Sequence, residues 1–301
     1  MLKKVLILTG CTGIGKTALS IGIAKLFDME IISADSVQVF KEFNIGSAKI
    51  SKEEMENIPH YGIDILTADK EFTVSDFVAF AKEKIEEIYK NGKIPLIVGG
   101  TGLYIKALTE GYNFGDTNKN VKFRQEMEEL YNSKGIDYLY SKLKDMSPEL
   151  AEKTESKNKN RIIRALEIAT FGNAKMRNLN QEYDFKIISL QMDRQNLYER
   201  INHRCSIMIE KGLLNEVKDL YAKYGNCQPM RAIGYKEVVS YILGEISLEQ
   251  MINLISQHTR NYAKRQITFM KTIENVIYFD AEDQNCIKLI EENIKKWLNQ
   301  K

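Results

Sequence analysis

The N-terminal third of the chain alternates short apolar runs with longer stretches of helical periodicity. Strands are expected at Val5–Leu8, Glu30–Ser33 and Ile94–Val98, because each is a β-branched or apolar run fit for a strand buried on both faces. Between them, Thr17–Phe27 and Asp76–Tyr89 carry apolar residues at helical spacing. This alternation predicts a parallel α/β sheet whose ligand binds at the carboxyl ends of the strands.

The pattern changes after about Gly115. Residues 121–170 show helical periodicity, broken by polar residues at 132–135 and 153–160, and they contain no convincing strand. This pattern of apolar and polar residues is typical of an all-helical insert, which we place at residues 114–185.

The chain then returns to the sheet. Lys186–Leu190 predicts a further strand, and the remainder is helical apart from a short strand near 276–279. We therefore expect an α/β core of residues 1–113 and 186–301, in which helices flank a parallel sheet, interrupted by the helical insert.

Composition narrows the class of protein further. The net charge of the 301 residues is +2, so an acidic partner must be met by a local basic patch. The four cysteines form no C-x-x-C pair and the three histidines lack metal-ligand spacing, which argues against a zinc ribbon or a disulfide framework. The apolar run Val5–Leu8 is too short for a signal peptide, and no stretch approaches a membrane span. We expect a cytoplasmic protein that does not enter the membrane.

A phosphate-binding motif joins the first expected strand to the first expected helix. The motif G-x-x-x-x-G-K-[ST] is formed by Gly10, Cys11, Thr12, Gly13, Ile14, Gly15, Lys16 and Thr17. Glycines let the loop's N–H groups converge on an anion, and the helix N-terminus adds positive potential. Lys16 adds a full charge, and Thr17 is placed to bind a Mg²⁺ that shares the phosphate oxygens. We call residues 10–17 the P-loop.

The P-loop alone does not establish the use of ATP. A nucleoside-triphosphate hydrolase also needs an acid at another strand end, and the strand ending at Val98 runs into Gly-Gly-Thr. The carboxylate that does follow a strand is Asp35. An acid there could bind a metal, cap a helix or act as a base.

A series of further blocks resembles the tRNA dimethylallyltransferase (isopentenyltransferase) family. With GCTGIGKT, the blocks are IISADSVQVF, IGSAKI, IPHYGIDIL, GKIPLIVGGTGLYIKAL, NRIIRALE, DRQNLYERINHRCSIMIEKGLLNEVKDLY, MRAIGYKEV and TRNYAKRQITFMK. They stand in family order and cover most of the chain, to about Phe279. The resemblance implies transfer of a dimethylallyl group from its diphosphate to N6 of the adenosine 3′-adjacent to the anticodon of tRNAs. It also implies Mg²⁺ as cofactor, and we expect a monomer that binds the anticodon stem-loop.

The resemblance also implies roles for individual residues. Asp35 would accept a hydrogen bond and then the proton of N6, because an exocyclic adenine amine is a poor nucleophile that a carboxylate must orient. Lys16, Thr17 and Thr101 would complete the catalytic set, and Arg231 would reach the diphosphate. The residues expected to contact tRNA are Asp35, Ser36, Val37, Gln38, Thr101, Arg124, Lys159, Asn160, Arg161, Ile162 and Ile163.

Some of these residues have simpler alternatives. Thr101 could be the N-cap of a helix at 103–108, and Arg231 could be an ordinary surface arginine. Two locally basic stretches, 157–177 and 256–272, could contact an RNA backbone or form solvated helix faces. Departures from the family pattern, which bear on tRNA selectivity, are Phe40 for a tyrosine, Tyr61 for a histidine, Asn158 for an aspartate and Phe269 for a tryptophan.

Other functions remain open at this stage. An adenylate isopentenyltransferase would use free AMP and would not need the basic helical insert. An ATP-dependent P-loop kinase would leave the ordered family blocks unexplained. A paralogue that binds tRNA without catalysis would have no use for Lys16 and Asp35.

Overall fold

The chain divides into two compact units. The computed structural model describes residues 2–111, 121–172 and 182–300. Met1–Thr109 with Gln181–Lys301 forms one unit, the core unit, and Glu110–Asn180 forms the other, the helical unit. The sheet of the core unit includes Tyr183, which lies three residues before the start that we expected for the second core segment.

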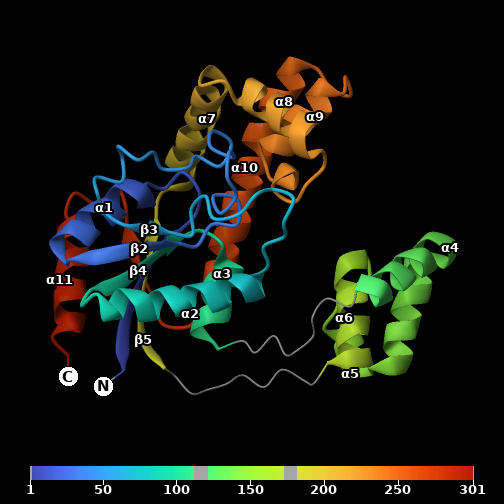
Figure 1. Cartoon of the computed structure of the whole chain (residues 1–301), viewed down its shortest axis with the longest axis horizontal. Coiled ribbons are helices and arrows are strands. Elements are labelled where there is room, and N and C mark those ends of the chain that lie inside the picture. Colours follow the sequence, from blue (N-terminus) through green and yellow to red (C-terminus); the bar gives the residue numbers. More distant parts are fainter. Residues whose placement is uncertain (1, 112–120, 173–181, 301) are drawn as a thin grey trace. The chain divides into compact units, whose positions relative to one another are not determined.

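A six-stranded parallel sheet runs through the core unit in the order β3-β2-β4-β1-β5-β6 (Figure 1). The strands are β1 (Lys3–Gly10), β2 (Met29–Ser33), β3 (His60–Tyr61), β4 (Ile94–Gly99), β5 (Tyr183–Gln191) and β6 (Val276–Asp280). The α/β fold expected from the sequence is therefore confirmed, and so is each of its five expected strands. The two-residue strand β3 was missed, because it is too short to carry a periodic signal.

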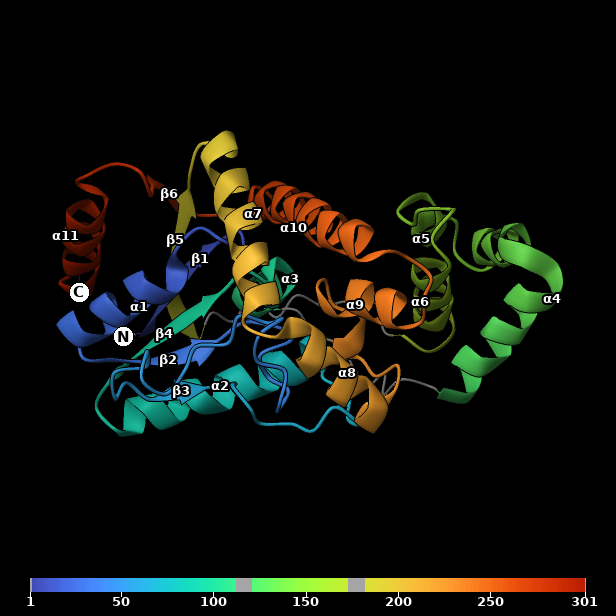
Figure 2. The ribbon, with the colours of Figure 1, turned by 90° about the horizontal axis from the view of Figure 1, so that it is seen from above.

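The helices of the core unit either cover the two faces of this sheet or pack on other helices. They are α1 (Lys16–Leu26), α2 (Val74–Lys90), α3 (Gly102–Thr109), α7 (Arg194–Glu210), α8 (Leu213–Tyr224), the 3₁₀ turn η1 (Pro229–Arg231), α9 (Tyr235–Ile242), α10 (Leu248–Met270) and α11 (Cys286–Leu298). Helices α1 and α2 lie on opposite faces, and α7 and α10 run side by side in both views (Figure 2). Helix α2 begins where Thr73 and Asp76 form a capping box, and it ends before Gly92, whose φ is 73°.

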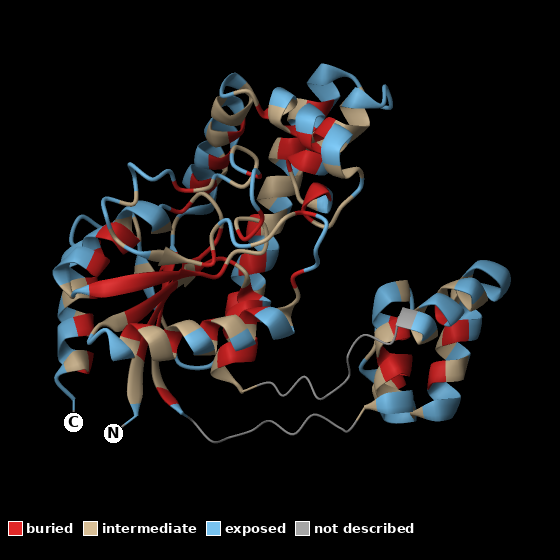
Figure 3. Ribbon diagram, viewed as in Figure 1, coloured by how far each residue is buried: buried red, intermediate tan, exposed pale blue. Residues whose placement is uncertain are grey.

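The strands form the buried centre of the core unit (Figure 3). Residues 5–10 of β1 and all five residues of β2 are buried, as expected for parallel strands covered on both faces. Among the described residues, no helix is both long enough and apolar enough to cross a membrane.

The helical unit has a small apolar core of its own. It contains α4 (Val121–Met146), α5 (Pro148–Glu152) and α6 (Lys159–Phe171). Helix α4 breaks at Gly135, where φ is 82°, inside the polar stretch that the sequence marked as a break. The buried side chains are Met127, Leu139, Leu143, Ala151, Ile162, Ile163, Ala165 and Leu166.

The last helix is anchored to the sheet by Trp297. Its side chain is buried, and its indole N–H donates to Asp184 Oδ2 at 2.8 Å. Lys4 of β1 donates to the carbonyls of Trp297, Leu298 and Gln300 at 2.6–2.9 Å, which pairs the carboxyl end of α11 with a positive charge.

Trp297→Ala should therefore lower the free energy of unfolding by about 3–5 kcal/mol, because it leaves a cavity and removes the hydrogen bond to the half-buried Asp184. Urea unfolding followed by circular dichroism measures this loss, since the substitution removes the single tryptophan. Leu289→Ala, on an exposed position of the same helix, is the control and should change stability by less than about 0.5 kcal/mol. Equal losses in both variants would contradict the anchoring role.

Candidate active site

A cavity of about 620 Å³ opens in the core unit at the carboxyl ends of β1, β2 and β4. Segments of α7, α9 and α10 complete its wall. Ten of the candidate site residues from the sequence line this cavity: Thr12, Gly13, Gly15, Lys16, Thr17, Asp35, Ser36, Val37, Gln38 and Arg231. The structure thus brings the P-loop and the expected base into one site.

The P-loop is shaped by glycines. Gly13 and Gly15 have φ values of 82° and 100°, a region that favours glycine, and Gly15 directly precedes α1. Gly10, Cys11 and Ile14 are buried and are not among the residues that line the cavity. These three residues support the loop from the core side, whereas the others face the cavity.

Lys16 is held by the loop itself. Its Nζ donates to the carbonyls of Gly10 at 2.9 Å and Cys11 at 2.8 Å. Burial lowers the pKa of Lys16 to about 8; the charge of Arg204 acts in the same direction, and Cys11 and Asp35 oppose it. A phosphate group bound in the cavity would favour the charged lysine.

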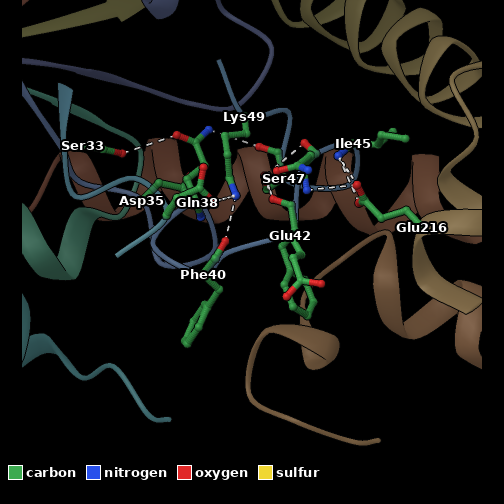
Figure 4. A network of polar contacts seen from close by, with 12 residues as sticks. Ser33, Asp35, Gln38, Phe40, Glu42, Ile45, Ser47, Lys49 and Glu216 are labelled. Carbon is green, nitrogen blue, oxygen red and sulfur yellow. Dashed lines mark hydrogen bonds and ion pairs between the residues drawn. The ribbon is translucent and has the colours of Figure 1, made fainter. Parts of the chain in front are cut away.

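Asp35 follows β2 and caps the turn that it begins. Its Oδ1 accepts the N–H of Val37 at 2.8 Å and that of Gln38 at 3.1 Å (Figure 4). None of its hydrogen bonds within the described residues falls on Oδ2. Burial and then the charge of Asp35 raise the pKa of Tyr262 to about 12. The carboxylate is both fixed by one oxygen and available through the other.

Gln266 of α10 ties the P-loop to the end of β4. Its Oε1 accepts the N–H of Thr12 at 2.9 Å, and its Nε2 donates to the carbonyl of Gly100 at 2.8 Å. Thr101 stands next to this bridge, and its N–H donates to the carbonyl of Ala34 at 3.4 Å. Thr101 itself is not among the residues that line the cavity, so the structure places it behind the wall.

Positive charge dominates the wall of the cavity. One carboxylate, Asp35, and six cationic side chains line it: Lys16, Arg200, Arg204, Arg231, Lys236 and Arg265. Arg231 is exposed and also lines the cavity. It is therefore a surface arginine, as one alternative from the sequence had it, and it lies where the other alternative, contact with a diphosphate, requires it. The excess of cations makes the cavity suited to a multiply charged anion.

Four of these cations were not predicted to line this cavity, although Arg265 belongs to the basic stretch 256–272 noted in the sequence. Arg200 and Arg204 come from α7, Lys236 from α9 and Arg265 from α10. The spacing of Arg200 and Arg204, four residues apart on a helix, was an available signal for a shared basic face. It could not say that this face meets the P-loop, because that follows from tertiary packing.

Comparisons with known proteins agree with this site. A family model described as IPP transferase matches residues 38–273. A tRNA dimethylallyltransferase from Thermoanaerobacter sp. (strain X514) is 45% identical over 98% of this chain and 97% of its own length. The chain belongs to the tRNA dimethylallyltransferase (IPP transferase) family. A tRNA dimethylallyltransferase from Bacillus anthracis is 42% identical over 93% of this chain and 92% of its own.

Solved structures of tRNA dimethylallyltransferases share the fold. The tRNA isopentenylpyrophosphate transferase of Bacillus halodurans matches with a TM-score of 0.75 at 39% identity, covering 98% of this chain and 96% of its own. A eukaryotic dimethylallyltransferase acting on tRNA matches with a TM-score of 0.82 at 28% identity, covering 97% of this chain and 78% of its own.

The oxygen groups at the P-loop fit a magnesium ion only as a partner of a bound phosphate. Thr17 is exposed at the start of α1 and lines the cavity together with Asp35. Among the described residues, no group of three or more His, Cys, Asp or Glu side chains could hold a metal. Mg²⁺ commonly binds through one or two protein groups, with water and phosphate oxygens as the other ligands. Thr17 suits this mode.

The residues of the helical unit that were expected to contact tRNA have different surroundings. Ile162 and Ile163 are buried in the core of the unit, so their side chains serve packing and are not available for surface contact. Arg124 forms hydrogen bonds at 3.1 and 2.6 Å with the buried carboxylate of Glu167, which ties it to the fold. This pair is structural, because a buried charge requires a partner.

The other three residues of this group lie on the surface at the start of α6. Lys159 pairs with Glu128 at 2.9 Å, and Asn160 is exposed. The Arg161 side chain is 68% exposed and reaches Glu155 at 3.3 Å. Arg161 is thus the most accessible cation of the three residues. Lys175 and Arg177, in the basic stretch 157–177, lie outside the described residues.

The departures from the family pattern occupy defined packing positions. Phe40 is fully buried. Tyr61 donates to the buried Glu30 at 2.8 Å. Asn158 is the N-cap of α6 and accepts the N–H of Arg161, as an aspartate would. The ring of Phe269 fills the space where Gly102 lacks a side chain. None of the four residues is among those that line the cavity.

The pKa of Lys16 makes anion binding depend on pH. Below about pH 8 the lysine is charged in the free protein, and above it the proton must be supplied on binding. The affinity for a non-reacting analogue of dimethylallyl diphosphate should therefore fall as the pH rises above about 8, by up to about tenfold per unit.

Calorimetric titration between about pH 7 and 9.5 measures this dependence. Lys16→Met should bind weakly and without the inflection. Lys25→Met, on the exposed last turn of α1, is the matched control and should keep it. A flat profile in the unmodified protein would exclude Lys16 as the titrating group.

Proposed function

We propose that the protein transfers a dimethylallyl group from dimethylallyl diphosphate to N6 of adenosine 37 of tRNA, 3′-adjacent to the anticodon. The products are i6A and diphosphate. Membership of the tRNA dimethylallyltransferase family supports this assignment. The observation that carries it is the placement of Lys16 and Asp35 in one cation-rich cavity.

The geometry suits the chemistry of the transfer. N6 of the adenine forms a bond to C1 of the donor, the bond between C1 and the diphosphate oxygen breaks, and the N6 proton leaves. Asp35 takes this proton on Oδ2, since Oδ1 is engaged by the N–H groups of Val37 and Gln38. A carboxylate that is already fixed by its neighbours can orient the amine before the bond forms.

The departing diphosphate carries the largest change in charge. Lys16 and the free N–H groups of the P-loop would stabilise that charge, and Arg204 and Arg231 line the same cavity. When bound, Mg²⁺ would be held by Thr17 and would add positive charge at the phosphate oxygens. The P-loop would thus hold a leaving group.

A kinase reaction fits the site less well. Strand β4 ends at Gly99, where a Cβ would lie 2.2 Å from the carbonyl oxygen of Ala34. The end of β4 therefore has no room for the acidic side chain that holds the metal in many P-loop enzymes.

The helical unit favours tRNA over free AMP as acceptor. A mononucleotide would be satisfied by the cavity of the core unit alone. The exposed Arg161 and the half-buried Lys159 at the start of α6 are suited to a phosphate backbone, and we assign the unit to contact with tRNA. We also propose that the protein acts as a monomer.

A transfer assay with labelled dimethylallyl diphosphate, Mg²⁺ and parallel acceptors tests the function. Unmodified tRNA with adenosine at position 37 should be labelled, and AMP should not. Asp35→Asn keeps the size of the side chain and should lower the rate by about 10²–10⁴-fold with tRNA affinity nearly unchanged. Asp69→Asn, on the surface of the core unit, should match the unmodified protein. Label on AMP, or loss of tRNA binding with normal chemistry, would contradict the assignment.

Arg161→Ala should weaken tRNA binding and reduce the slope of log affinity against log salt by about 1, because one phosphate contact is lost. Filter binding over a range of salt concentrations measures both effects. Lys153→Ala is the matched control, since Lys153 is 67% exposed in the same unit and is likewise paired with a glutamate, Glu149. An unchanged slope for Arg161→Ala would remove this residue from the RNA-binding surface.

A further inference from the structure

The side chain of Gln38 is held by the main chain around it. Its Nε2 donates to the carbonyls of Ser47 at 3.2 Å and Ala48 at 3.3 Å, and its Oε1 accepts from Ser33 Oγ at 3.4 Å. Its own N–H donates to Asp35. Two carbonyl acceptors fix which end of the amide carries the NH₂ group. The orientation of Gln38, and its register against Asp35, therefore depends on where residues 47 and 48 lie.

The segment 44–48, which we call the support loop, belongs to no helix or strand. Its N-terminal N–H groups converge on Glu216 of α8. The carboxylate accepts Asn44 N–H at 3.0 Å, Ile45 N–H at 2.8 Å and Gly46 N–H at 3.1 Å (Figure 4). Three successive N–H groups directed at one point form an anion site, and here a side chain of the protein fills it.

Tyr235 of α9 completes the attachment. Its hydroxyl donates to Glu216 Oε1 at 2.8 Å, and its side chain is fully buried. A Cβ on Gly46 would lie 2.5 Å from the ring of Tyr235, so only a glycine allows this approach. The support loop is thus clamped between α8 and α9. Gly46, Ser47 and Ala48 also line the cavity.

We propose that Glu216 is a positioning residue for the transfer reaction. It fixes the support loop, the support loop orients the amide of Gln38, and Gln38 sets the acceptor adenine against Asp35. Glu216 does not line the cavity, so it acts through these intermediates. The inference rests on the proposed function, because it concerns the acceptor side of that reaction.

A second carboxylate provides the contrast for a test. Glu42 also joins this region to α8: it accepts from Lys223 Nζ at 2.8 Å and from the hydroxyl of Tyr224 at 2.7 Å. Its partners are side chains at the exposed carboxyl end of the helix, and it makes no contact with the support loop N–H groups. Glu42→Gln therefore removes another contact between this region and the same helix without moving Gln38.

Glu216→Gln keeps the shape of the side chain but turns an NH₂ group toward N–H donors. The variant should lower kcat for tRNA by about 10- to 100-fold, the scale expected when a positioning group is displaced. The KM for dimethylallyl diphosphate should stay within about twofold, because the P-loop is untouched. Glu42→Gln should leave both constants unchanged. A wild-type kcat in Glu216→Gln would overturn the inference.

A double-mutant cycle with Gln38→Ala separates positioning from general stability. If Glu216 acts through Gln38, the double variant is no slower than Gln38→Ala alone, because the loss is shared. Independent losses that multiply would overturn the inference, as would full activity of Gln38→Ala.

Hydrogen exchange gives a readout that does not need activity. The N–H groups of residues 44–46 should exchange faster in Glu216→Gln than in Glu42→Gln. Equal exchange would overturn the inference even if transfer to tRNA is normal. Absence of transfer in the unmodified protein would instead defeat the proposed function, and the exchange result would still decide whether Glu216 holds the loop.

Discussion

The site depends on a contact between two strand ends that only glycine permits. At Gly99 a Cβ would lie 2.2 Å from the carbonyl oxygen of Ala34, so the ends of β4 and β2 meet backbone to backbone. This approach places Asp35, which follows β2, beside the segment that leads to Thr101. The hydroxyl of Thr9 in β1 donates to Gly99 at 2.9 Å and adds the P-loop strand to the same junction. Phosphate binding and proton transfer share one cavity because three strands can end this close together.

Positive charge is concentrated around this junction, although the net charge of the chain is small. The chain as a whole carries a net charge of only +2, yet six cations and one carboxylate line the cavity. The cations come from α1, α7, η1, α9 and α10, and they project from rigid elements rather than from a basic tail. An anion that enters meets charges that are already in place, so little reorganisation is needed when charge develops during the reaction.

The strands, the P-loop and Asp35 could be predicted because each is indicated by a short run of consecutive residues. Gln266 and Glu216 could not, since their partners are main-chain groups more than a hundred residues away in sequence. A weak signal existed for Gln266: it is a polar residue on the face of α10 that otherwise carries buried Ala263 and Met270. Ile162 and Ile163 show the opposite error, because a stretch shared with a family indicates importance but not whether a side chain packs or binds.

The order of the strands along the chain has a consequence for synthesis at the ribosome. Strand β1 is among the first segments made, but one of its two neighbours in the sheet, β5, begins only at Tyr183. The helical unit is one continuous segment made in between, so its contacts are local and can form early. Until β5 has been made, one edge of the apolar strand β1 is unpaired, and such edges are prone to aggregate. The position of the insert therefore sets how long the nascent chain must be protected.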